Sequence, residues 1–218
     1  MILAVTGGKG GVGKSTVAYN LGAALDAVVV DADLGMADLP AGRGPDLHDV
    51  LAGRAAAVEA VREGGPVDIL PCGRSLAGAR ATDPRRLVAA VEAVERHYGT
   101  VVLDCPAGLG SDVGLPLLVA EASVLVTTPD EVALADAVRA RALARELDAG
   151  LVAVALNRSG ETPPTDRVAR TFGAPVVAVP ERAAVARGMA NGLPAGRVEC
   201  DAGEAFCELA GRVRSVSR

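Results

Sequence analysis

The sequence predicts an α/β fold, a doubly wound and mostly parallel sheet with helices on both faces. Seven short apolar runs alternate along the chain with segments of helical periodicity. The runs are continuously apolar, as in parallel strands that are covered on both faces. Half of the 218 residues are apolar, which is enough to bury a sizeable core.

The expected strands are separated by the helical segments, which is the order of a sheet with right-handed crossovers. No repeat or linker is visible, and the Pro/Gly loop at 40–46 is too short to separate domains. Residues 1–218 are therefore expected to form a single domain. The predicted strands lie at 1–6, 27–33, 67–71, 100–104, 123–128, 151–157 and 175–179.

Apolar periodicity predicts the helices between these strands. Apolar residues recur every four positions through 14–25, and Asp83 before Pro84 has the form of an N-cap followed by Pro at the first helical position. Segment 130–148, rich in Ala, Leu and Arg, is predicted to be one long helix. The predicted apolar faces contain Val17, Leu21 and Leu25 in the segment 14–25, and Leu87, Val91 and Val94 in the helix after Pro84. In the last helix, within 201–218, the apolar face contains Phe206, Leu209, Val213 and Val216.

Composition narrows the class of protein. The chain has 22 basic and 27 acidic residues, a net charge of −5, which argues against a general nucleic-acid binder. None of the four cysteines has the spacing of a zinc or iron–sulfur motif, so they are expected to be small core residues in a reducing cytosol. The first residues lack the features of a signal peptide, and no apolar run approaches the roughly 18 residues of a membrane span. A cytoplasmic protein is expected.

The stretch "GGKGGVGKST" at residues 7–16 carries the clearest chemistry. Gly8 to Ser15 match the phosphate-loop pattern G-x-x-x-x-G-K-S, and they follow a predicted strand and open a predicted helix. Glycines let successive backbone N–H groups turn toward a phosphate, and the helix adds its positive N-terminal end. Lys14 is expected on the β- and γ-phosphates, Ser15 on Mg²⁺ and Thr16 near the α-phosphate. The predicted nucleotide-binding loop is Gly8, Lys9, Gly10, Gly11, Val12, Gly13, Lys14, Ser15 and Thr16.

Both lysines of the chain, Lys9 and Lys14, lie in this loop, whereas every other basic residue is arginine. The basic pattern does not require Lys9. With it, "KGGVGKST" resembles the deviant phosphate loop of the MinD/ParA family of dimeric ATPases, and archaeal-type MinD most closely. The resemblance implies that Lys9 crosses a dimer interface to the phosphates bound by the partner. A lysine that makes only a contact within its own subunit is the alternative.

Two further motifs resemble the switches of that family. In "VVVDADLGMADL" (28–39), the resemblance implies that Asp33 positions the attacking water, that Asp31 helps to hold Mg²⁺, and that Gly35 belongs to the first switch. In "VVLDCPAGLG" (101–110), it implies a magnesium role for Asp104. Pro106 and Gly108 then form the second switch, in which the N–H of Gly108 contacts the γ-phosphate.

The resemblance continues to about residue 210 and places the nucleotide base. Asn157, in "LNRSG" at a strand end, is expected to read adenine with its amide, with Arg158 beside it. The segment 177–194 resembles the base-side segment of the family, in which Pro180 and Glu181 line the adenine pocket. Asn191 of this segment is equally well explained as a helix C-cap. The last predicted helix resembles the final helix of the fold, so membrane association is expected to be weak or absent.

The motifs, together with the resemblance to the MinD/ParA family, predict a MinD-like ATPase switch. The resemblance implies Lys9, Lys14 and Asp33 as its catalytic residues and ATP/ADP and Mg²⁺ as its cofactors. The switch is expected to dimerise on ATP, to hydrolyse ATP slowly and to position cellular machinery through a regulatory or cargo protein, with any membrane contact made through that partner. A ParA-like partitioning ATPase on DNA, an ATP-dependent biosynthetic enzyme and a module that holds ATP without hydrolysing it remain alternatives. Cys105 beside Asp104, and the isolated His48 and His97, are expected to be packing or surface residues.

Overall fold

The computed structural model describes residues 1–35, 39, 42–108, 111–197 and 201–216. In this part of the chain, seven strands form one parallel sheet in the order β3-β2-β4-β1-β5-β6-β7. Every predicted strand is present, which confirms the doubly wound α/β fold. The strands are β1 (Ile2–Thr6), β2 (Val28–Asp31), β3 (Ile69–Leu70), β4 (Val101–Asp104), β5 (Ala122–Thr127), β6 (Gly150–Ser159) and β7 (Val176–Pro180).

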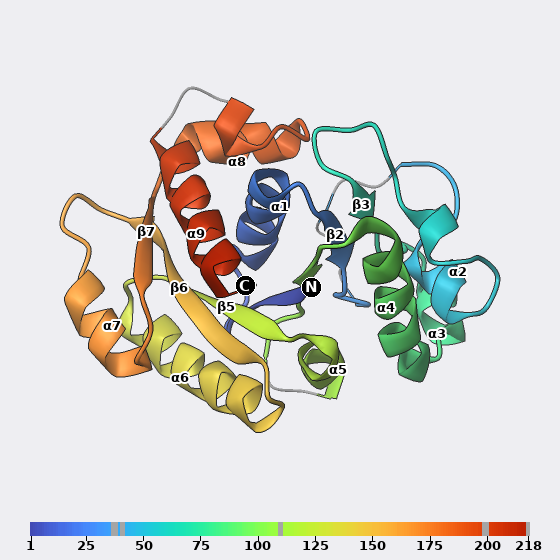
Figure 1. Ribbon diagram of the computed structural model, residues 1–218, viewed down its shortest axis with the longest axis horizontal. Helices are drawn as coiled ribbons and strands as arrows, with labels where there is room; N and C mark the ends of the chain where they lie inside the picture. Colours follow the sequence, from blue (N-terminus) through green and yellow to red (C-terminus); the bar gives the residue numbers. More distant parts are fainter. Residues whose placement is uncertain (36–38, 40–41, 109–110, 198–200, 217–218) are drawn as a thin grey trace.

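Helices cover both faces of the sheet, as Figure 1 shows. They are α1 (Lys14–Leu25), α2 (Leu47–Leu51), α3 (Leu76–Ala81), α4 (Leu87–Tyr98), α5 (Ser111–Val119), α6 (Glu131–Glu146), α7 (Thr165–Phe172), α8 (Ala183–Ala190) and α9 (Ala202–Val216). Short 3₁₀ turns are found at Val58–Ala60, Pro84–Arg86 and Ala195–Arg197.

Apolar side chains on the two sides of the sheet form separate layers of the core. On one side, α1 and α9 pack against the sheet through residues such as Leu21, Phe206 and Leu209. On the other side, α2, α4 and α5 pack against β1, β2 and β4, and α6 and α7 pack against β5 and β6. Since β1 is buried along its whole length, the loop that follows it starts from a fixed point at the centre of the sheet.

The helix ends follow their capping residues. Asp83 accepts the backbone N–H of Arg85 and starts the 3₁₀ turn that leads into α4. Asp130 accepts the N–H of Ala133 at 2.9 Å and starts α6. Such caps stabilise a helix because they satisfy backbone N–H groups of its first turn. Both predicted helix starts are confirmed.

Two details of the sequence-based prediction are wrong. Val216 is 63% exposed and does not belong to the packed face of α9. Cys207 is exposed, whereas Cys72 and Cys105 are buried as expected; Cys200 lies outside the described residues. No helix within the described ranges has both the length and the apolar character needed to cross a membrane.

Candidate functional site

The candidate site begins at the carboxyl end of the central strand β1, where residues 7–13 turn into α1. Gly13, the N-cap of α1, has a φ of 95°, which favours glycine. A Cβ atom at Gly8 would lie 2.0 Å from the carbonyl oxygen of Asp136. The loop therefore packs against the backbone of α6, and glycine is needed at this position for close approach.

The two lysines of the loop have different environments. Lys14 is 8% exposed, and its ammonium Nζ donates to the carbonyl oxygen of Lys9 at 3.4 Å. The Lys9 side chain is 45% exposed, with its Nζ 3.8 Å from Oδ1 of Asp130. Hydrogen bonds from the Thr128 hydroxyl and the Ala133 N–H, and then the charge of Lys9, hold the pKa of Asp130 below its usual range. A salt bridge this exposed contributes little to stability.

Two carboxylates lie side by side at the ends of β2 and β4. Asp31 and Asp104 are register partners in the parallel pair, and neither is more than 1% exposed. Two buried carboxylates on adjacent strands repel one another unless a cation lies between or beside them. Mg²⁺ is typically held by one or two carboxylates together with phosphate oxygens and water. This donor set, with the Ser15 hydroxyl at the start of α1, fits Mg²⁺.

Cys105 follows Asp104 but has none of the properties of a nucleophile. Burial, and then the charge of Asp104, raise the pKa of its thiol, so the thiol stays protonated at neutral pH. The backbone N–H of Cys105 donates to the carbonyl oxygen of Val5 at 3.1 Å. Cys105 is a packing residue, as the sequence indicated.

The expected switch residues lie just beyond these strand ends. Asp33 is partly buried, and its Oδ1 accepts the N–H of Gly35 at 3.2 Å. Pro106 is buried, and Gly108 has a φ of 100°. The backbone also joins the two switches, because the N–H of Ala32 donates to the carbonyl oxygen of Asp104 at 3.0 Å.

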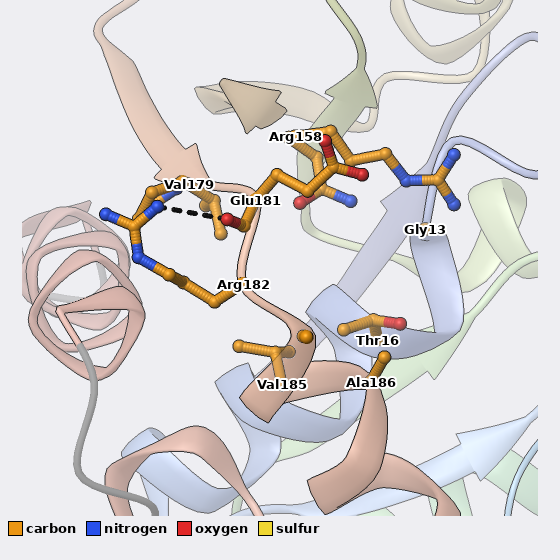
Figure 2. Close-up of a pocket in the computed structure, with 11 residues that line it drawn as sticks. Gly13, Thr16, Arg158, Val179, Glu181, Arg182, Val185 and Ala186 are labelled. Carbon is orange, nitrogen blue, oxygen red and sulfur yellow. Dashed lines mark hydrogen bonds between the residues drawn. The ribbon is translucent and has the colours of Figure 1, made fainter. Parts of the chain in front are cut away.

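A cavity of about 390 Å³ opens beside the phosphate loop between β6, β7 and α8 (Figure 2). It brings together the residues that were expected to bind the base with Val179 and the first turn of α8, which lie in the expected base-side segment 177–194 but were not singled out there. The helix pattern after Pro180 could have revealed this wall, since it places small side chains on one face. The lining residues are Gly13, Thr16, Asn157, Arg158, Val179, Pro180, Glu181, Arg182, Ala183, Val185 and Ala186.

Polar side chains shape the mouth of this cavity. Arg158 has a φ of 53°, a conformation that a non-glycine residue rarely adopts, and it lies where the register between β6 and β7 shifts. Figure 2 shows Arg158 and Glu181 on the same side of the cavity. Arg182 is bonded to Asp201 through Nε, at 2.8 Å. This bond holds the pKa of the Asp201 carboxyl below its usual range and ties the cavity wall to the start of α9.

Asn157 connects the cavity to the phosphate loop. Its side chain is 7% exposed, and its amide nitrogen donates to the carbonyl oxygen of Val12 at 2.8 Å. A Cβ atom at Gly13 would lie 2.2 Å from the same nitrogen. Asn157 thus lines the cavity and also braces the loop, and the second role was not visible in the sequence.

Residues 3–195 match the family model of the CobQ/CobB/MinD/ParA nucleotide binding domain. The chain belongs to this family. The predicted resemblance to MinD/ParA proteins is therefore confirmed. The chain is 32% identical over 167 residues to an ATP-binding protein of Methanocaldococcus jannaschii, covering 72% of this chain and 63% of that protein. It is 31% identical over 171 residues to the septum site-determining protein MinD of Synechocystis, covering 72% and 64%.

Solved structures of this family show the same architecture. The cell division ATPase MinD of Pyrococcus furiosus superposes with a TM-score of 0.91 at 30% identity, covering 99% of this chain and 98% of that one. MinD of Pyrococcus horikoshii, complexed with Mg-ADP, gives the same score and identity and covers 99% and 96%. The chain spans less than two thirds of the length of the two curated relatives described above.

Proposed function

We propose that this protein is a MinD-like ATPase switch that binds ATP with Mg²⁺, dimerises on ATP and hydrolyses it slowly. The observation that carries the proposal is the unequal burial of the two loop lysines. Lys14 is buried against its own loop, where it can neutralise a phosphate bound there. Lys9 is half-exposed on the outside of the same loop, where a second subunit can reach it.

The residues of the site fit the parts of phosphoryl transfer to water. The loop amides and Lys14 bind the β- and γ-phosphates, and Ser15, Asp31 and Asp104 hold the metal. When bound, Mg²⁺ neutralises charge on the phosphates. Asp33 orients the attacking water, and Lys9 from the partner supports the same phosphates. MinD of Pyrococcus horikoshii, which holds Mg-ADP, supports this assignment of cofactors.

The base occupies the cavity beside the loop. Asn157 reads adenine with the part of its amide that faces the cavity, and Arg158, Pro180 and Glu181 enclose the nucleotide. The N–H of Gly108 senses the γ-phosphate, so that hydrolysis releases the second switch together with Pro106. Gly35 gives the first switch the freedom to follow.

The likeness to MinD proteins that determine the septum site supports a role in placing cellular machinery. We propose that residues 1–218 act as one ATPase domain in the cytoplasm. The domain acts as a homodimer, and a regulatory or cargo protein recognises this dimer. Contact with a membrane is made through that partner. A ParA-like role on DNA is less well supported, because the net charge is −5 and DNA binding depends on a cluster of basic side chains.

The test is sedimentation of the whole chain with Mg²⁺ and either ADP or a non-hydrolysable ATP analogue. We expect a monomer with ADP and a dimer with the analogue, together with measurable release of phosphate from ATP in single-turnover assays. Bound ATP should resist displacement by an equal concentration of GTP. The same mass in both nucleotides would contradict the switch, and hydrolysis without dimerisation would favour a metabolic enzyme.

A further inference from the structure

His48 is a buried residue that the proposed chemistry does not use. It lies in the short helix α2, which a reciprocal pair of bonds between Asp46 and Asp49 caps. The helix is joined to the end of β3 by a bond from the N–H of Leu47 to the carbonyl oxygen of Pro71 at 2.9 Å. The His48 side chain is 3% exposed, so its ring is held by the core and by the loop that follows β3.

The ring contacts the first switch directly. Nε2 of His48 lies 3.1 Å from the carbonyl oxygen of Leu34 and 3.4 Å from Sγ of Cys72. A carbonyl oxygen can only accept, so Nε2 must carry the hydrogen. Nδ1 is buried and has no hydrogen-bond partner within the described ranges. The contact with the Leu34 carbonyl group therefore selects the tautomer with hydrogen on Nε2.

The surroundings fix the orientation of the ring. A Cβ atom at Gly73 would lie 2.2 Å from Nδ1 of His48, so the backbone of this loop packs directly against the imidazole. Burial, and then the charge of Asp31, raise the pKa of the Cys72 thiol to about 12. The thiol is therefore protonated at neutral pH and does not compete with Leu34 as a charged acceptor.

Leu34 is the residue after Asp33, whose carboxylate bonds to the N–H of Gly35. The bond from His48 therefore holds the backbone of the turn that carries Asp33. We propose that His48 is a positioning residue for hydrolysis, which fixes Asp33 through the carbonyl group of Leu34. The inference rests on the proposed role of Asp33 in orienting water.

The test compares substitutions that keep or remove the donor at Nε2. The amide nitrogen of His48→Gln reaches the place of Nε2, whereas His48→Phe fills the space without a donor and His48→Asn is too short to reach Leu34. For Phe and Asn we expect kcat to fall at least about 10-fold, since a misplaced catalytic group costs up to roughly 10² in rate. KM for ATP should stay within about twofold, and Gln should restore kcat to within about threefold.

The matched control is His97→Phe, at the exposed C-terminal end of α4, which should leave kcat unchanged. If the Phe variant does not fold, the Asn and Gln pair decides the question. The chain has two histidines, so ¹⁵N labelling of histidine also gives two imidazoles to assign. We expect the Nε2–H tautomer for His48, with a change in its signals between ADP and a non-hydrolysable ATP analogue.

Equal kcat in wild type, Phe and Asn variants would overturn the inference, as would an Nδ1–H tautomer. These results leave the proposed function intact, because wild-type hydrolysis is measured in the same assay. Wild-type protein that binds Mg-ATP without hydrolysing it would instead contradict the proposed function, and the positioning role with it.

Discussion

The amide of Asn157 donates to the carbonyl oxygen of Val12 at 2.8 Å, across 145 positions of the chain. This bond joins the end of β6 to the phosphate loop, so the expected base-binding residue is also a support of the phosphate site. A displacement of the Asn157 side chain would therefore alter both the cavity expected to bind the base and the phosphate loop. If Asn157 binds the base as we propose, this one buried amide couples ATP binding to the geometry of the loop.

Removal of this amide should weaken the protein even without nucleotide. Asn157→Ala leaves the Val12 carbonyl group buried without its donor, a loss of about 1–3 kcal/mol. For a chain of this size we expect the melting temperature of the nucleotide-free protein to fall by roughly 2–10 °C. The measurement is calorimetry in the absence of nucleotide.

Asn191→Ala is the matched control, because Asn191 is exposed at the end of α8 and its side-chain amide donates to the carbonyl oxygen of Arg187 at 2.8 Å. Its melting temperature should stay close to that of the wild type. If Asn157→Ala loses ATP affinity at an unchanged melting temperature, the brace to Val12 is unimportant, and Asn157 acts on the base alone.

The buried carboxylates of Asp31 and Asp104 give rise to a second prediction. Asp31→Asn removes one of two like charges that are register partners and keeps the shape of the side chain. Its melting temperature in EDTA should therefore be higher than that of the wild type. The stabilisation that Mg-ATP provides should shrink, because a carboxylate ligand is lost.

Thermal melts with and without Mg²⁺ measure both effects of Asp31→Asn. Asp33→Asn is the control, since Asp33 is partly exposed and lies outside the pair; its melting temperature in EDTA should match the wild type. A lower melting temperature for Asp31→Asn in EDTA would mean that the carboxylate is stabilised by the protein itself and not by a metal.

The strands and most helices could be predicted because their signals are local. Parallel strands covered on both faces are continuously apolar, and Asp83 before Pro84 marks a helix start by its own chemistry. The phosphate loop was equally visible, since its glycines, Lys14 and Ser15 are adjacent in the sequence.

Features that depend on distant segments were not predictable. The bonds of Asn157 to Val12 and of His48 to Leu34 join residues from different elements, and no local pattern indicates them. Val216 was placed wrongly for the same reason. The apolar spacing of α9 continues through it, but α1 ends at Leu25, and Arg214 already bonds to the carbonyl oxygen of Ala24.

The packing of α9 gives a third prediction. Phe206, Leu209 and Val213 are at most 2% exposed, so this face is part of the core and is not available to lipid. We expect the isolated protein to remain in the supernatant in liposome sedimentation, with and without ATP. An exposed residue such as Val216 contributes too little apolar surface for stable binding.

Two substitutions in α9 distinguish packing in the core from binding to a membrane. Leu209→Ala should lower the free energy of unfolding by about 2–5 kcal/mol, as for a buried leucine, and Val216→Ala should change it by less than about 0.5 kcal/mol. ATP-dependent pelleting of the wild type that Val216→Ala abolishes would show that α9 serves as a membrane helix.

The last prediction distinguishes the role of Lys9 in dimerisation from the role of Asp33 in hydrolysis. The Lys9 side chain is half-exposed, and its contact with Asp130 at 3.8 Å is too weak to hold it in place. Lys9→Ala should therefore bind ATP through Lys14 and the loop amides but remain monomeric and inactive. Asp33→Ala should keep the lysine contact across the dimer and accumulate as an ATP-bound dimer, because loss of a positioned base costs on the order of 10²–10⁴ in rate.

Light scattering with ATP and Mg²⁺ distinguishes these states of Lys9→Ala and Asp33→Ala. Asp130→Asn is the control, because asparagine still caps α6 while the charge opposite Lys9 is removed; it should dimerise as the wild type does. If Lys9→Ala still dimerises on ATP, Lys9 acts within its own subunit. The retention of a second lysine in an arginine-rich chain would then need a different explanation, such as neutralising phosphate charge in its own loop.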